Sequence, residues 1–326
     1  MNGFTREIFE SFQVRKTKKQ KTAFLGYLRG FAEERGYSLK IEKGSFGSRN
    51  AVVGDPDRAR VVYTAHYDTC PVLPFPNFIT PKCFGLYLLY QIAILLPILA
   101  IFFGVSFLLG LGVGALVERG LIGEQSADLL AYLGFWVLYF GVFGLLLAGP
   151  ANKHTANDNT SGVITLLSIM DRLPEEERAH VAFVFFDLEE AGMIGSSSFA
   201  KAHPTVREKT LLVNFDCVSD GKKILLVAKK EAEGEIGRLS EAFSARGELF
   251  SVEIASKGVF YPSDQSRFKH GVGVASLKYS KLLKTDYMDR IHTPRDVIFE
   301  EENVDFLTDC ALRLAKSYAQ EGSSAV

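Results

Sequence analysis

Two long runs without a charged side chain constrain the fold of this chain more than any other feature. Residues 83–117 form 35 consecutive uncharged positions, and residues 129–152 form 24 more. About 20 apolar residues span the core of a bilayer, so each run is long enough to cross it as a helix. A pair of very apolar helices buried in a soluble core is the alternative, which runs of this length disfavour. We therefore expect a transmembrane hairpin that places residues 84–117 and 129–149 in lipid.

The first run is longer than one crossing needs and contains Pro97 near its middle. A helix of this length would tilt, kink or lie partly along the interface. The connecting loop 118–128 holds one basic residue, Arg119, against three acidic ones, whereas Lys82 and Lys153 flank the pair on the other side. The positive-inside rule and the lack of an apolar leader at the N-terminus predict that the rest of the chain is cytoplasmic.

Outside the apolar runs, strand-like and helix-like segments alternate. Continuous apolar stretches predict strands over 60–65, 180–186, 210–215, 223–228 and 274–277. Helical periodicity predicts helices over 16–35, 160–172, 232–246 and 301–319. Apolar strands flanked by helices indicate a sheet covered on both faces. We expect a three-layer α/β sandwich with a central mixed sheet, built as one domain from residues 1–80 and 151–326, with the hairpin inserted at 81–150.

The charge balance and the cysteines exclude two classes of protein. With 37 basic and 38 acidic residues, the chain shows no excess of positive charge for a polyanion, so no nucleic-acid partner is expected. Cys70, Cys83, Cys217 and Cys310 lack the spacing of a disulfide framework or of a paired metal motif. We interpret them as reduced thiols of an intracellular protein.

Polar side chains follow three of the predicted strands. His66 and Asp68 follow the strand at 60–65, and further acidic residues follow the next two: Glu189, Glu190 and Asp216. Asp158 and His292 lie on predicted loops. Sites in open α/β sheets form beyond the carboxyl ends of the strands, where crowded carboxylates need a cation or protons. Imidazole with carboxylate suits zinc or a similar divalent ion, and five ligands suit two ions that share a carboxylate.

At these positions the sequence resembles the zinc aminopeptidases of the M28 type. The resemblance rests on five segments in the family order: "HYD" at 66–68, "ANDNTSG" at 156–162, "DLEEAG" at 187–192, "NFD" at 214–216 and "IHTPRD" at 291–296. It implies two metal ions, expected to be zinc, held by His66, Asp158, Glu190, Asp216 and His292. In the family pattern Asp158 bridges the ions. Glu189 is the general base and Asp68 is the partner that orients His66.

The resemblance implies a membrane-anchored dimetal aminopeptidase whose substrates are peptides with a free N-terminus. Glu189 would take a proton from the attacking water and pass it to the leaving amine. Two other functions stay open. A glutaminyl-cyclase-like acyltransferase would use the same scaffold with one zinc, and a receptor-like domain built on an inactive peptidase would be expected to have lost ligands or the base.

The sequence departs from the family pattern in two places. Gln265, in "PSDQSRF" at 262–268, stands where histidine is usual in the family. This difference affects the expected substrate pocket and leaves the expected metal ligands unchanged. The separation between His66 and Asp158 is also far longer than in soluble relatives, and the apolar hairpin fills it.

Overall fold

The computed structural model describes residues 3–244 and 249–324. The chain divides into two compact units, Met1–Phe84 with Ala151–Val326, and Gly85–Pro150. The larger unit is built on a nine-stranded sheet. Its strands are β1 (Leu39–Lys43), β2 (Arg49–Val53), β3 (Val61–His66), β4 (Val181–Phe186), β5 (Leu211–Phe215), β6 (Lys223–Ala228), β7 (Ser251–Ala255), β8 (Gly271–Ser280) and β9 (Thr285–Tyr287).

The sheet is mixed. Its strand order is β1-β2-β4-β3-β5-β8-β6-β7, and β9 pairs with β8 outside this path. The central strands β4, β3, β5 and β8 run parallel to one another, and β7 is parallel to β6. The other pairings are antiparallel. The predicted mixed sheet is therefore confirmed.

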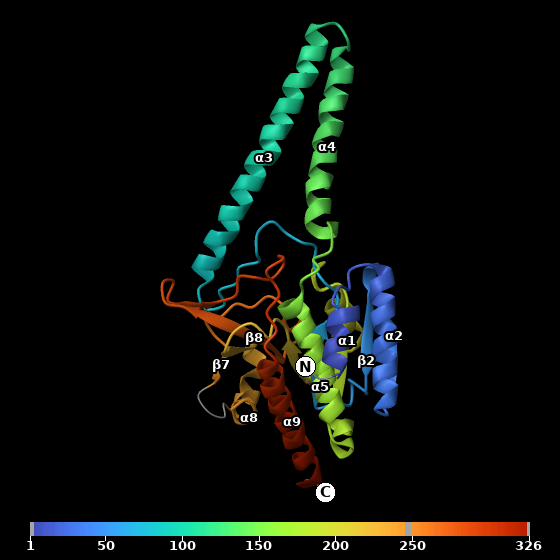
Figure 1. The fold of residues 1–326 in the computed structure, drawn as a ribbon, viewed down its shortest axis with the longest axis vertical. Coiled ribbons are helices and arrows are strands. Elements are labelled where there is room, and N and C mark those ends of the chain that lie inside the picture. The colour runs from blue at the N-terminus through green and yellow to red at the C-terminus, as the bar shows by residue number, and fades with distance from the viewer. Residues whose placement is uncertain (1–2, 245–248, 325–326) are drawn as a thin grey trace. The chain divides into compact units, whose positions relative to one another are not determined.

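Helices cover both faces of the sheet. The helices α1 (Gly3–Ser11), α2 (Lys18–Glu34), α5 (Gly162–Arg172), α8 (Ile236–Ala242) and α9 (Glu301–Ser324) share the largest apolar core with one face. The helices α6 (Ile194–Ala202) and α7 (Pro204–Lys209) pack on the other. Tyr63 and Val62 on β3 enter the two different cores because successive side chains of a strand point to opposite faces. Figure 1 shows α1, α5 and α9 lying along one side of the strands. This is the three-layer arrangement expected from the sequence.

The five predicted strands correspond to β3, β4, β5, β6 and β8. The strands β1, β2, β7 and β9, and the helices α1, α6 and α7, were not predicted. The predicted helix at 232–246 was too long: a short 3-10 turn over Lys230–Glu235 precedes α8, which ends at Ala242. Residues 245 and 246 of that prediction lie outside the described residues. The other predicted helices correspond to α2, α5 and α9.

The smaller unit is a hairpin of two long helices, α3 (Phe84–Glu118) and α4 (Glu124–Ala148), joined by a short loop (Figure 1). Aromatic rings join them: the Phe102 ring lies 5.2 Å from that of Phe135 and 6.4 Å from that of Tyr139. Both helices are long and apolar enough to cross a membrane. Only 6% of the apolar window of α3 and 0% of that of α4 is buried.

Candidate metal centre

Three parallel strands bring histidine and carboxylates to one edge of the sheet. His66 is the last residue of β3 and pairs with Phe186, the last residue of β4. β5 pairs with the other side of β3 in the same direction. The residues that follow β4 and β5, among them Glu189, Glu190 and Asp216, therefore leave the sheet beside His66.

Asp158 joins the two histidines of the site. It lies in η2, an irregular turn over Ala156–Ser161 that immediately precedes α5. One carboxylate oxygen of Asp158 lies 3.3 Å from His66 Nε2, and the other lies 3.0 Å from His292 Nε2. A carboxylate that offers one oxygen to each side is the arrangement needed to bridge two cations.

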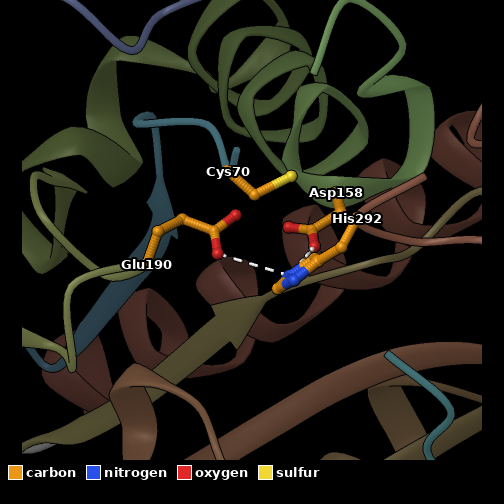
Figure 2. Close-up of side chains that lie close together, drawn as sticks. All are labelled: Cys70, Asp158, Glu190 and His292. Carbon is orange, nitrogen blue, oxygen red and sulfur yellow. Dashed lines mark ion pairs between the residues drawn. The ribbon is translucent and has the colours of Figure 1, made fainter. Parts of the chain in front are cut away.

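Two groups of possible metal ligands share Asp158. The first group is His66, Asp158 and Asp216, and the second is Cys70, Asp158, Glu190 and His292. Within each group the donor atoms lie within 4.8 Å of one another. Figure 2 shows the four side chains of the second group pointing toward one another, with His292 paired to both Asp158 and Glu190. The five ligands expected from the sequence thus lie in one cluster.

The residues fit a pair of zinc ions. Imidazole and carboxylate are common zinc ligands, and thiolate is a third. Glu190 Oε1 is buried and has no hydrogen-bond partner among the described residues, so this oxygen is available to coordinate a metal ion. His66, Asp158 and Asp216 would hold one ion, and the second group would hold the other.

The electrostatics of the cluster also call for positive charge. Burial raises the pKa of Glu189 well above its usual range and that of Glu190 to about 8. Burial opposes protonation of both histidines, but nearby carboxylates raise the pKa of His66 well above its ordinary value and that of His292 to about 9. Burial also opposes ionisation of Asp158, yet hydrogen bonds from the two histidines hold its pKa below the ordinary value. Bound divalent cations would neutralise the negative charge of these carboxylates, which bound protons neutralise when no metal is present.

Asp68 contacts both sides of the site. The backbone N–H groups of Glu189 and Glu190 donate to its two carboxylate oxygens, at 3.0 and 3.3 Å. His66 Nδ1 lies 3.1 Å from the Asp68 carbonyl oxygen and 3.6 Å from its carboxylate. The orienting contact to His66 is thus made by the Asp68 backbone, whereas its carboxylate holds the segment that carries the expected base.

Asp187, the first acidic residue after β4, does not join this cluster. Its carboxylate accepts a hydrogen bond from Lys21 Nζ at 2.6 Å and another from the Arg49 backbone at 3.0 Å. Lysine on α2 therefore neutralises it.

Two supporting residues were missed at the sequence level. Asp296 accepts hydrogen bonds from the backbone N–H groups of Asn157 and Asp158, at 2.8 and 3.0 Å, and so fixes the turn that presents Asp158. Ser263 donates to Asp216 Oδ2 at 2.5 Å. Both residues lie inside motifs visible in the sequence, "IHTPRD" and "PSDQSRF", but neither motif shows which backbone or carboxylate they reach.

A small cavity of about 230 Å³ opens onto the cluster. Its lining includes Glu189 with the apolar side chains of Ile79, Tyr261 and Ile291. Gln265 is not part of this lining: it is buried and accepts a hydrogen bond from Asn214 at 3.1 Å while donating to the Tyr261 carbonyl at 2.8 Å. Its place is thus beneath the pocket rather than in it.

The sequence matches the model for peptidase family M28 over residues 142–316, which is more than half of the chain. This range contains four of the five expected ligands, and His66 lies before it. No curated protein matches the chain by sequence.

Solved structures share the fold at low sequence identity. A glutaminyl cyclase from Porphyromonas gingivalis aligns with a TM-score of 0.55 and 14% identity, over 97% of this chain and 96% of its own. A Zn-dependent exopeptidase from Parabacteroides distasonis aligns with a TM-score of 0.55 and 14% identity, over 96% and 95%. The LapA aminopeptidase of Legionella pneumophila aligns with a TM-score of 0.53 and 14% identity, over 97% of this chain and 68% of its own.

Proposed function

The chain belongs to peptidase family M28, and from this premise we propose that it is a dimetal aminopeptidase that removes N-terminal residues from peptides. The observation that carries the proposal is the position of Asp158, with one oxygen toward His66 and the other toward His292. A single-ion site has no need of a carboxylate shared in this way, whereas a two-ion hydrolase does.

The chain's own residues supply the proton transfers. Zinc bound at this site would polarise the scissile carbonyl and acidify the attacking water. Glu189 lines the cavity, and its carboxylate would accept the proton of that water and return it to the leaving amine. Asp68 keeps Glu189 in place by accepting the hydrogen bond of its backbone N–H.

The same cavity supports a preference for a small or medium apolar residue at the substrate's N-terminus. Ile79, Tyr261 and Ile291 line a space of about 230 Å³, below the usual range for drug-sized ligands. The carboxylates at its base would attract a protonated amine. We propose peptides with a free N-terminus as the substrates on these grounds.

A single-zinc glutaminyl cyclase activity is the second candidate. It is favoured by the near-complete alignment of the Porphyromonas gingivalis glutaminyl cyclase with this chain. It is disfavoured by the presence of both ligand groups, because a one-ion enzyme would need only one of them. The two functions differ in product: one releases an amino acid, and the other releases ammonia.

The test uses the full-length chain in detergent, reconstituted with zinc. A panel of aminoacyl fluorophores reports aminopeptidase activity, and a peptide with N-terminal glutamine reports cyclisation by ammonia release. We expect hydrolysis of apolar aminoacyl substrates that a chelator abolishes and zinc restores. Ammonia release from the glutaminyl peptide without hydrolysis of the panel would replace the peptidase proposal with the cyclase one.

We further propose that α3 and α4 anchor the enzyme in a bilayer, with the metal centre on the cytoplasmic side. The support is the length, composition and exposure of the two helices. His66 and Asp158 precede and follow the hairpin, so both flanks occupy the same compartment. Lys82 and Lys153 flank the hairpin, and the loop between the helices contains a single basic residue, Arg119, which supports placement of that loop outside.

A further inference from the structure

Cys70 is held beside the metal centre by the segments that lead into and out of the hairpin. Its carbonyl oxygen accepts a hydrogen bond from the Asn152 backbone at 3.1 Å, and Pro71 forms a bridge with Ala151. The side-chain nitrogen of Asn152 lies 3.9 Å from Cys70 Sγ. These contacts hold Cys70 beside the cluster.

The Cys70 sulfur belongs to a complete set of four metal-binding side chains. Its Sγ lies with donor atoms of Asp158, Glu190 and His292 inside a limit of 4.8 Å (Figure 2). Cys70 is fully buried. The second, independent observation is Glu190 Oε1: its side chain is 10% exposed, and the atom has no hydrogen-bond partner among the described residues.

We propose that Cys70 is the fourth protein ligand of the ion held by Asp158, Glu190 and His292. This inference rests on the proposed dimetal function and deepens it, because the two ions then have different environments. The first group, His66, Asp158 and Asp216, supplies three ligands. The second group supplies four and completes a tetrahedral shell.

The difference assigns separate tasks to the two ions. Zinc sites with four protein ligands are closed and structural, whereas catalytic sites keep one position open. The open position therefore lies at the ion of His66 and Asp216, and the ion of Cys70 organises the site. Cysteine binds as the thiolate, so each chain releases one thiol proton to solvent when this ion binds. A sulfur ligand also favours zinc over harder ions such as magnesium or manganese at that position.

Cys217 is a second buried cysteine near the cluster and provides a comparison for Cys70. It is also buried and lines the cavity beside Asp216. Its Sγ lies 3.2 Å from Asp216 Oδ1 and donates a hydrogen bond to that carboxylate. It is absent from both ligand groups formed by the described residues.

The test replaces zinc with Co²⁺ in the purified full-length chain and records its absorption spectrum. A cobalt–thiolate bond gives a charge-transfer band in the near ultraviolet, separate from the visible bands that any bound Co²⁺ shows. We expect this band in the unmodified chain and in Cys217→Ser, and its complete loss in Cys70→Ser while visible cobalt bands remain. ¹¹³Cd NMR of the unmodified chain needs no variant, and we expect one of two resonances to be shifted downfield by sulfur.

Several outcomes would overturn the assignment. A charge-transfer band that persists in Cys70→Ser, or one that disappears in Cys217→Ser only, places the sulfur ligand elsewhere or nowhere. Visible cobalt bands without a charge-transfer band, with two cadmium resonances in the oxygen and nitrogen range, refute Cys70 ligation and leave the dimetal function intact. If the chain binds neither cobalt nor cadmium, both the ligation by Cys70 and the dimetal function are refuted.

Discussion

Single side chains at the metal centre have unequal roles, and Asp158 has the largest. It is the one carboxylate that contacts both histidines. Of the two histidines, Asp216 is paired with His66, at 3.6 Å, and Glu190 is paired with His292, at 3.3 Å. In the proposed dimetal site, the loss of Asp158 would therefore remove a ligand from both ions, whereas the loss of either neighbour would remove a ligand from one.

This asymmetry predicts the metal content of alanine variants. We expect Asp158→Ala to lose affinity for both ions and Asp216→Ala to lose affinity for one. Zinc per chain, measured after dialysis against a weak chelator, should approach zero in the first variant and one in the second. Equal losses in the two variants would contradict the bridging role of Asp158.

Adjacent glutamates allow a matched test of the general base. Glu189→Gln should retain both ions and lose about 10²- to 10⁴-fold in turnover, because it removes a proton acceptor and no ligand. Glu190→Gln makes the same chemical change one residue later and should lose metal. Metal analysis and turnover, measured on both variants, check the assignment; near-normal turnover in Glu189→Gln would refute it.

At the scale of elements, the site depends on the turn formed by the "ANDNTSG" segment, whose supporting contacts the motif alone does not show. The η2 turn begins at Ala156 and presents Asp158 just before α5. Its shape is fixed by Asp296, whose carboxylate accepts two backbone hydrogen bonds and is 1% exposed. The position of the bridging ligand is therefore set by a residue that touches neither ion.

Asp296→Ala should consequently weaken metal binding at a distance. Loss of a residue that positions a ligand typically costs 10- to 100-fold in metal affinity, and two unpaired buried N–H groups cost about 1–3 kcal/mol each. Zinc titration and thermal denaturation measure the two effects. Asp309→Asn is the matched control, because Asp309 forms an exposed ion pair with Arg172 that contributes at most about 1 kcal/mol. Wild-type zinc affinity in Asp296→Ala would contradict the role of this turn.

The sequence predicted the elements that can be identified from the hydrophobic pattern of their own residues. The strands β3, β4 and β5 are buried at every position and mostly apolar because both of their faces are covered, and their ends locate the site. The edge strands β1 and β7 have mixed sequences with exposed residues, and their strand character depends on the neighbours they pair with. Cys70 was not predicted as part of the site, because its position depends on the pairing of Pro71 with Ala151 across the hairpin insertion.

At the scale of the whole molecule, the hairpin lies between His66 and Asp158 in the sequence, so the proposed membrane anchor must cross the bilayer an even number of times. Two helices satisfy this condition. A chain that crossed the bilayer only once between His66 and Asp158 would place the ligands of one site in two compartments.

The topology can be checked by cysteine labelling in intact cells. In a variant without native cysteines, a cysteine at Gly123, between the helices, should react with an impermeant thiol reagent. A cysteine at the exposed Lys201 of the larger unit should react only after the cells are lysed. The reverse pattern would contradict the proposed orientation. Extraction of the protein by high salt, without detergent, would contradict the hairpin.

The central claim is that the enzyme works with two zinc ions, and zinc titration of the metal-free full-length chain tests it most directly. Aminopeptidase turnover is followed against the number of zinc ions bound per chain. We predict that turnover reaches its plateau only when two ions are bound, because the ligands of both are needed to complete the site around Asp158. A plateau at one ion per chain would contradict the dimetal account.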